Sequence, residues 1–226
     1  MVGDFMKTIL ITGGAQGLGK ALVKEFLGNN YKILIGYNTS YESALKLKVN
    51  NVDIVKLDIT NEKDIENVFN NYKVDVLINN AALSMDSEIE DKSKEEFMKV
   101  LEVNTVGTFM MCKYAVNNGV KSIINISSTD SDDTYSTLDI DYSSSKAGVN
   151  IITKTFALRY PDIRIIGILP NWINTESVIK ADPNYLKSEL DRIGQSELLK
   201  KEDVAKRIYE IYIDKNIESG SLVRIG

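Results

Sequence analysis

The chain has 226 residues, of which 43% are apolar, and these suffice for a sizeable hydrophobic core. Its net charge of −5, with acids interleaved among the lysines and arginines, argues against nucleic acid or an anionic membrane surface as a partner. The single cysteine excludes an internal disulfide, and no apolar run approaches the roughly 20 residues that cross a bilayer, so we expect a cytoplasmic protein.

Short β-branched runs alternate with longer helical patterns along the chain. Strands are expected at 7–12, 32–37, 52–57, 74–79, 122–127, 163–169 and 222–225, and helices near 17–29, 41–49, 61–71, 93–118, 142–159 and 202–214. Most of the strand runs are apolar almost throughout, as strands buried on both faces must be. The alternation predicts an α/β fold with a doubly wound parallel sheet of about seven strands and helices on both faces, and we interpret 1–226 as one domain.

A glycine-rich turn, "TGGAQGLG" (12–19), joins the first expected strand to the first expected helix. Gly13, Gly17 and Gly19 permit a tight turn and a close backbone approach to a pyrophosphate, while the helix N-terminus offers free N–H groups to the anion. Placement inside a βαβ unit favours dinucleotide binding over a purely structural turn. No Gly-Lys-Ser/Thr follows the turn, which argues against a Walker-type phosphate loop.

The second expected strand ends in "GYNTS" (36–40), where an acidic side chain would hold the 2′-hydroxyl of NAD. Neutral hydrogen-bonding residues stand there instead, Asn38 among them. No lysine or arginine lies in this segment to pair with a 2′-phosphate. The segment therefore favours NADP, with NAD as the alternative cofactor.

Six motifs follow one another along the chain: "TGGAQGLG" (12–19), "NNAA" (79–82), "VNTVG" (103–107), "INISS" (124–128), "YSSSK" (142–146) and "PNWINT" (170–175). In this order they resemble the short-chain dehydrogenase/reductase family over essentially the whole length. The glycine spacing is similar to that of the compact oxidoreductase branch. The resemblance implies a Rossmann-type fold and hydride transfer with a nicotinamide cofactor.

The resemblance also implies a set of cofactor-binding residues. These are Gly13, Gly17, Leu18 and Gly19 at the pyrophosphate, Asn38 at the end of the second strand, Asp58 and Ile59 beside the adenine, Asn80, Ala81 and Ala82 beneath the adenosine ribose, Tyr142 and Lys146, and Ile173 and Thr175 at the nicotinamide amide. Two positions depart from the family pattern, since Ala82 and Asn171 each replace a usual glycine.

Ser128, Tyr142 and Lys146 match the family's catalytic serine, tyrosine and lysine, and Asn104 matches the asparagine that completes a water-mediated proton relay. Ser128 precedes Tyr142 by fourteen residues where thirteen is commoner, so Ser127 is the alternative serine.

The chain contains no histidine, so another side chain must carry protons. Tyr142 and Lys146 stand four positions apart, which on a helix places them on one face. A cation about 5 Å away should lower the tyrosine pKa by about two from its usual value near 10. Tyr142 would then serve as general acid or base, with Ser128 holding the carbonyl oxygen. The alternative is an ordinary helix pair and a strand-end hydroxyl.

Three further segments surround the expected site. The loop 129–141 contains five aspartates, and two alternatives are open for Asp130, Asp132 and Asp133: they face the cleft and disfavour anionic substrates, or they are solvated turn and cap residues. A short substrate-side element is expected near 176–198. The helix 142–159 carries apolar residues on more than one side, which predicts a homodimer or homotetramer.

The sequence therefore predicts an NADP-preferring oxidoreductase that acts on a small-molecule carbonyl or alcohol, with no metal. Two alternatives remain: a nucleotide-binding regulatory module without turnover, and a reductase of ketoacyl thioesters carried by a protein.

Overall fold

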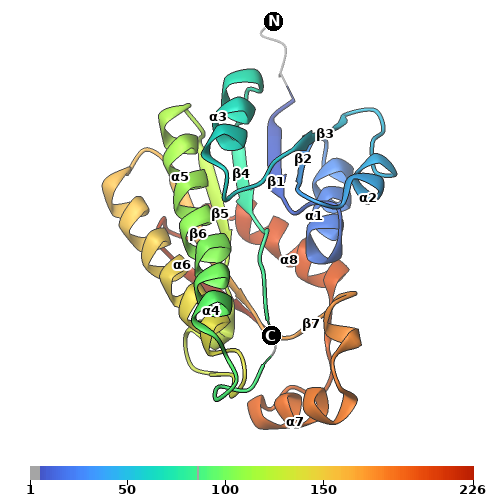
Figure 1. Cartoon of the computed structure of the whole chain (residues 1–226). Coiled ribbons are helices and arrows are strands. Elements are labelled where there is room, and N and C mark those ends of the chain that lie inside the picture. Colours follow the sequence, from blue (N-terminus) through green and yellow to red (C-terminus); the bar gives the residue numbers. More distant parts are fainter. Residues whose placement is uncertain (1–5, 86) are drawn as a thin grey trace, which may run out of the picture.

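A parallel sheet in the order β3-β2-β1-β4-β5-β6-β9 forms the centre of the structure (Figure 1). The computed structural model describes residues 6–85 and 87–226. The strands are β1 (Thr8–Thr12), β2 (Lys32–Tyr37), β3 (Val52–Lys56), β4 (Val76–Asn79), β5 (Ser122–Ile126), β6 (Arg164–Pro170) and β9 (Leu222–Ile225). The chain moves outward from β1 to β3, then returns to β4 on the other side of β1. This reversal creates a switch point at the carboxyl edge, where ligands of such sheets bind.

Helices cover both faces of the sheet and bury two separate apolar clusters. One cluster lies under α1 (Gly17–Gly28), α2 (Tyr41–Leu45) and α8 (Lys201–Ile213), and the other under α3 (Glu62–Asn71), α5 (Thr108–Asn117) and α6 (Ile140–Arg159). Residues of β1 alternate between the clusters: Ile9 and Ile11 face the first, and Leu10 faces the second. Figure 1 shows α5 and α6 on the opposite side of the sheet from α1 and α8. The predicted doubly wound α/β fold is confirmed.

The single helix expected at 93–118 is wrong in detail. The chain forms α4 (Lys94–Leu101), a π-helical segment (Glu102–Gly107) and then α5. A capping box between Ser93 and Glu96 begins α4. Inside the π-helical segment, a Cβ on Gly107 would stand 2.8 Å from the side chain of Ile59, so this close approach requires glycine. The wider turn changes the direction of the residues around Asn104, and a hydrophobic period does not reveal such a change.

The segment near 176–198 contains α7 (Pro183–Ile193), which the helix predictions omitted. Asp182 caps α7 by accepting the N–H groups of Asn184 and Tyr185, and Pro183 occupies the first turn. Gly194 ends the helix in the left-handed conformation, with φ of 70°. Asp182 followed by Pro183 is a helix-start signal and Gly194 a helix-end signal, and both are present in the sequence. Two short strands, β7 (Ile173–Asn174) and β8 (Leu199–Lys200), flank this segment and pair with each other.

A polar cluster lies within the core between the sheet and α5 and α6. Asn79 donates to Asn125 (2.8 Å), which donates to Thr153 (2.9 Å). The thiol of Cys112 lies 3.4 Å from the amide nitrogen of Asn79 and is fully buried. Burial raises its pKa to about 12, although the thiol donates a hydrogen bond to Asn125 and accepts one from Asn79. Cys112 is therefore a core residue.

Within the described part of the chain, we find no helix with the combined length and apolar character needed to cross a membrane.

Candidate active site

A cavity of about 640 Å³ opens at the carboxyl edge of the sheet, at the switch point. The turns that follow β1, β2, β4, β5 and β6 line it, together with α6 and the segment that leads to α7. The predicted site residues that line the cavity are Gly13, Gly17, Leu18, Gly19, Asn38, Asn80, Ala81, Ala82, Ser128, Tyr142, Lys146, Ile173 and Thr175. Asp58, Ile59 and Asn104 lie outside this lining.

The glycine-rich turn brings its backbone close to neighbouring strands, as a pyrophosphate site requires. Gly13 (φ 63°) donates its N–H to the Gly36 carbonyl at 2.8 Å, which fixes the turn to the end of β2. A Cβ on Gly19 would stand 2.3 Å from the Gly13 carbonyl oxygen, so only glycine fits there. Gly19 therefore lets the start of α1 pack directly against the turn.

A carboxylate contacts the start of α1 beside the glycine-rich turn. Glu176, in the segment after β7, accepts the Gly17 N–H at 3.1 Å through one oxygen. Its other oxygen accepts Lys201 Nζ at 2.7 Å, and these bonds hold the pKa of Glu176 below its usual value. The contact bridges the cavity from the β7 side to the start of α1. Sequence analysis did not identify Glu176, because the contact joins residues 159 positions apart.

Asn38 lies in a polar network at the ends of β2 and β3. Its amide nitrogen donates to Asp58 at 3.0 Å, and Lys56 Nζ donates to its oxygen. Lys56 stands at this end of the sheet because it pairs in register with Tyr37. The absence of a cation from "GYNTS" is therefore offset by a lysine from the neighbouring strand.

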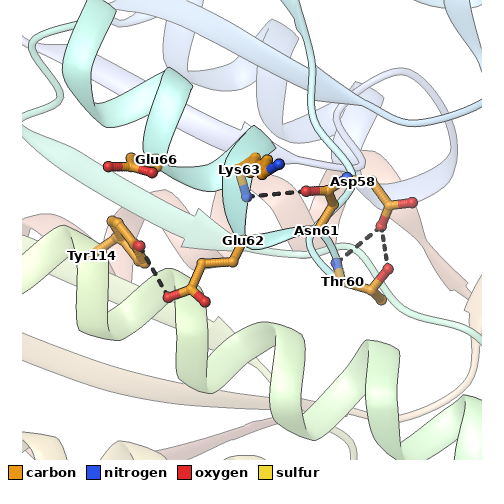
Figure 2. A pocket seen from close by; sticks show the side chains of 7 residues that line it. All are labelled: Asp58, Thr60, Asn61, Glu62, Lys63, Glu66 and Tyr114. Atoms are coloured by element: carbon orange, nitrogen blue, oxygen red, sulfur yellow. Dashed lines mark hydrogen bonds between the residues drawn. The ribbon is translucent and has the colours of Figure 1, made fainter.

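Asp58 lines a second, more open pocket of about 690 Å³ along α3 (Figure 2). Burial disfavours its charge, yet hydrogen bonds from Thr60 and Asn38 hold the pKa of Asp58 below its usual value. Figure 2 shows Thr60 donating to Asp58 and Tyr114 donating to Glu62. The side chains of this lining are polar, and several of them are hydrogen-bonded to one another. Ser128, Tyr142 and Lys146 lie in the first cavity and not here, so the first cavity is our candidate active site.

Tyr142 and Lys146 meet in the first cavity, as their spacing predicted. Lys146 Nζ lies 5.4 Å from the centre of the Tyr142 ring and donates to the Ile126 carbonyl at 2.8 Å. Burial lowers the pKa of Lys146 from 10.5 to about 8. The two side chains therefore share the cavity, with the amine tied to the end of β5.

The expected lowering of the Tyr142 pKa is wrong for the protein in this state. Burial raises this pKa, the carboxylates of Asp130 and Asp139 raise it further, and a hydrogen bond from Ser128 acts in the opposite direction. Desolvation and two nearby negative charges outweigh the single buried amine. The phenol is consequently held in its protonated form.

Ser127 and Ser128 both line the cavity, but their hydroxyls have different partners. Ser127 donates its hydroxyl to the Lys146 carbonyl at 3.1 Å and is committed to the backbone of α6. Ser128 donates to Asp130 at 3.1 Å and accepts the Asp130 N–H at 3.2 Å. The geometry favours Ser128, whose side chain is also linked to Tyr142.

Asn104 lies behind the cavity wall, in the π-helical segment. Its amide group accepts the Leu83 N–H and donates to the Leu83 carbonyl, both at 2.8 Å, and also donates to Ser145 at 2.9 Å. The side chain therefore fixes the turn after β4 against α6. Its role in a water relay behind Lys146 stays a prediction.

Only part of the aspartate-rich loop reaches the cavity. Asp130 and Asp139 line it, whereas Asp132 and Asp133 bind Arg224 at 3.2 and 2.6 Å and lie outside the lining. Of the two alternatives for Asp130, Asp132 and Asp133, a position facing the cleft holds for Asp130 alone, because Arg224 of β9 binds the other two outside the cavity. Trp172 and Tyr185, which sequence analysis did not assign, also line the cavity.

Within the described residues, no group of three or more histidine, cysteine, aspartate or glutamate side chains is arranged to hold a metal ion.

The chain is similar in sequence and in structure to known proteins. The family profile described as short chain dehydrogenase matches residues 7–185. Glucose 1-dehydrogenase 2 of Bacillus subtilis is 28% identical over 219 residues, which are 88% of this chain and 84% of that protein. The 3beta-hydroxysteroid dehydrogenase 1 of Eggerthella lenta is 31% identical over 188 residues, which are 75% of this chain and 71% of that protein. Among solved structures, ElxO with NADP bound has a TM-score of 0.83 and 29% identity, covering 98% of this chain and 97% of that chain.

Proposed function

The chain belongs to the short-chain dehydrogenase/reductase family and is an oxidoreductase, and from this premise we propose that it transfers hydride between NADP(H) and a small carbonyl or alcohol compound. One observation carries the proposal: Ser128, Tyr142 and Lys146 line the same cavity as the glycine turn. Two of the relatives described above are dehydrogenases. The glucose and hydroxysteroid in their names are not assigned to this chain as substrates.

The residues of the cavity fit a dinucleotide. Gly19 lets the start of α1 pack closely on the glycine turn, whose backbone would bind the pyrophosphate, and the cavity of about 640 Å³ extends from there to Tyr142. Gly17, Leu18 and Asn80 would hold the phosphates and the adenosine ribose, while Lys146, Ile173 and Thr175 would hold the nicotinamide end. When bound, the nicotinamide would supply or accept the hydride.

Tyr142 would donate its proton to the carbonyl oxygen as the carbonyl is reduced. Its raised pKa suits this acid role, because the phenol stays protonated at neutral pH. Ser128 would turn its hydroxyl from Asp130 toward the carbonyl oxygen and donate a hydrogen bond to it. Lys146 would hold the nicotinamide ribose, and its positive charge would assist the departure of the tyrosine proton.

Lys56 supports the choice of NADP over NAD. Its amine bonds to Asn38, at the place where the 2′ substituent of the adenosine ribose is expected, and a cation there would attract a 2′-phosphate. Asp58 lies in the same network and accepts from Asn38, so its charge opposes this attraction. We infer a preference for NADPH, with NADH bound more weakly.

An exposed apolar surface on α6 supports a homodimer or homotetramer. Ile151 and Leu158 are 63% and 86% exposed, and Val106 and Phe109 on the neighbouring helical segments are also exposed. Apolar side chains gathered on adjacent helices are typical of a contact between identical subunits. The segment 176–198, with Val178 and Tyr185 in the cavity lining, is our candidate for the substrate-side element.

A screen of purified protein separates the candidate functions. NADPH and NADH oxidation would be followed against ketones, quinones, sugars and ketoacyl thioesters. Turnover of a free ketone supports the proposed function, and turnover confined to thioesters supports the ketoacyl reductase. Tight NADPH binding without turnover of any compound would favour the regulatory module.

The single domain 1–226, the cytoplasmic location and the absence of nucleic-acid or membrane partners stay predictions.

A further inference from the structure

A buried ion pair joins the segment before α4 to the first turn of α6. Lys92 Nζ lies 3.0 Å from both carboxylate oxygens of Asp141. The side chains of Lys92 and Asp141 are only 3% and 0% exposed. No part of the chemistry described above uses this pair.

Asp141 also holds the backbone of Tyr142. One of its oxygens accepts the Tyr142 N–H at 2.9 Å. On the other side, Ser145 donates its hydroxyl to the Tyr142 carbonyl at 2.7 Å and accepts from Asn104. Both backbone polar groups of Tyr142 are therefore fixed by buried side chains.

The two connections lead to the same segment, the turn after β4. Lys92 donates to the Met85 carbonyl at 2.6 Å, and Asn104 holds both backbone groups of Leu83. Leu83 and Ser84 line the cavity. The first turn of α6 and the cavity wall after β4 are thus joined by two bridges, one ionic and one neutral.

Stability alone does not account for a buried ion pair. Removing two charges from water is costly, and replacing such a pair with apolar residues of similar volume is often neutral or stabilising. The contacts that the pair makes are therefore the place to look for its role. What it fixes here is the backbone at Tyr142.

We propose that Lys92 and Asp141 are positioning residues, which hold Tyr142 at the distance and angle needed for proton transfer in the cavity. The proposal rests on the proposed function, in which Tyr142 is the general acid. A misplacement of about 1 Å at a reacting group can lower the rate on the order of 10²-fold, so a fixed backbone at this residue has a direct effect on turnover.

The test compares the double variant Lys92→Met/Asp141→Leu with the wild type. We expect its urea midpoint to return close to the wild-type value, whereas each single variant unfolds at lower urea because one charge is left buried and unpaired. NADPH affinity should stay within about two-fold, and the KM of a reactive ketone should change little. The kcat should fall by about 10-fold or more. A folded double variant with wild-type kcat would overturn the proposal.

Two further variants test whether the effect is specific to the buried pair. The control Lys113→Met/Glu62→Leu removes an exposed pair, 45% and 55% exposed, and should leave kcat unchanged. Asp141→Asn keeps the shape and an oxygen for the Tyr142 N–H, so its kcat should lie between the wild type and the double variant. If the double variant does not fold, the kcat of Asp141→Asn is the test. A wild-type kcat of Asp141→Asn would then contradict the proposal.

Amide hydrogen exchange provides a test that requires no substrate. Peptides covering 140–146 should exchange faster in the double variant, while peptides from β5 should match the wild type. Equal exchange at 140–146 rejects the positioning role, even if no compound is turned over. Failure of the wild type to bind NADPH or to reduce any ketone would instead count against the proposed function.

Discussion

The carboxylate of Glu176 accepts the Gly17 N–H at 3.1 Å, at the first turn of α1, where the pyrophosphate of a dinucleotide is expected. A negative charge beside a bound phosphate opposes binding. Glu176→Gln should therefore tighten NADPH binding by about 3-fold to 10-fold, measured by nicotinamide fluorescence. Glu95→Gln, at an exposed position in the first turn of α4, makes the same change of charge and should have no effect. Equal affinities for the wild type and Glu176→Gln would show that the carboxylate leaves the site when the cofactor arrives.

Tyr142→Phe should lower kcat by about 10²-fold to 10⁴-fold, because the general acid is lost while the ring stays. NADPH affinity should barely change. Steady-state kinetics with a ketone identified in the screen would measure both. Tyr135→Phe, at a tyrosine 66% exposed in the nearby loop, is the matched control. Because the pKa of Tyr142 is raised above 10, reduction by the wild type should not decline through this group below about pH 10. Full activity of Tyr142→Phe would rule out the proposed acid.

Lys146 should make stability depend on pH, because its pKa falls from 10.5 to about 8 on folding. Between these pH values the unfolded chain binds the proton that the folded protein has released, so the free energy of unfolding rises with pH in this window. Below pH 8 both states are protonated, and the cost of the buried charge is constant, on the order of 3 kcal/mol.

Lys146→Met should remove this cost and flatten the pH profile from 8 to 10.5 in urea unfolding experiments. Lys154→Met, at an exposed position of the same helix, should keep the wild-type slope. An unchanged slope in Lys146→Met would mean that the amine keeps an ordinary pKa in the folded protein.

Lys56→Met should weaken NADPH binding by about 10-fold and leave NADH binding nearly unchanged, since only NADPH carries the 2′-phosphate. Titration of both cofactors would measure the ratio. Lys63→Met removes an exposed lysine from the start of α3 and should leave the ratio as in the wild type. Asn38→Asp should shift the preference toward NADH by adding a negative charge. Tighter NADH than NADPH binding in the wild type would reject the assignment.

Ile151→Asp should dissociate the proposed oligomer, because it places a charge in the exposed apolar surface of α6. Sedimentation at several concentrations would give the mass. Val49→Asp changes a valine that is 58% exposed outside this surface and should leave the mass unchanged. A monomeric wild type would show that the surface has another use.

The sheet and its ligand edge were predictable because their signals are local. Strands buried on both faces are apolar throughout, and the glycine turn stands directly between β1 and α1. The spacing of Tyr142 and Lys146 on one helix gave their shared position for the same reason. Each of these inferences needs only neighbouring residues and the period of one element.

The remaining features depend on contacts between distant parts of the chain. Lys56 reaches Asn38 only through the register of β3 against β2, and Glu176 reaches Gly17 only after the segment beyond β7 crosses the cavity. The raised pKa of Tyr142 likewise depends on the burial of its ring and on where the loop places Asp130 and Asp139. No period or motif encodes such juxtapositions.

The reactivity of the buried Cys112 thiol can be used to measure how often the core around it unfolds locally. The thiol belongs to the only cysteine in the chain, it is fully buried, and its pKa of about 12 leaves almost no thiolate at neutral pH. A thiol-specific reagent should therefore modify only molecules whose core between α5 and the sheet has opened. When closing is faster than labelling, the modification rate reports the population of the open form, so the stability of every variant can be followed without a substrate or an added probe.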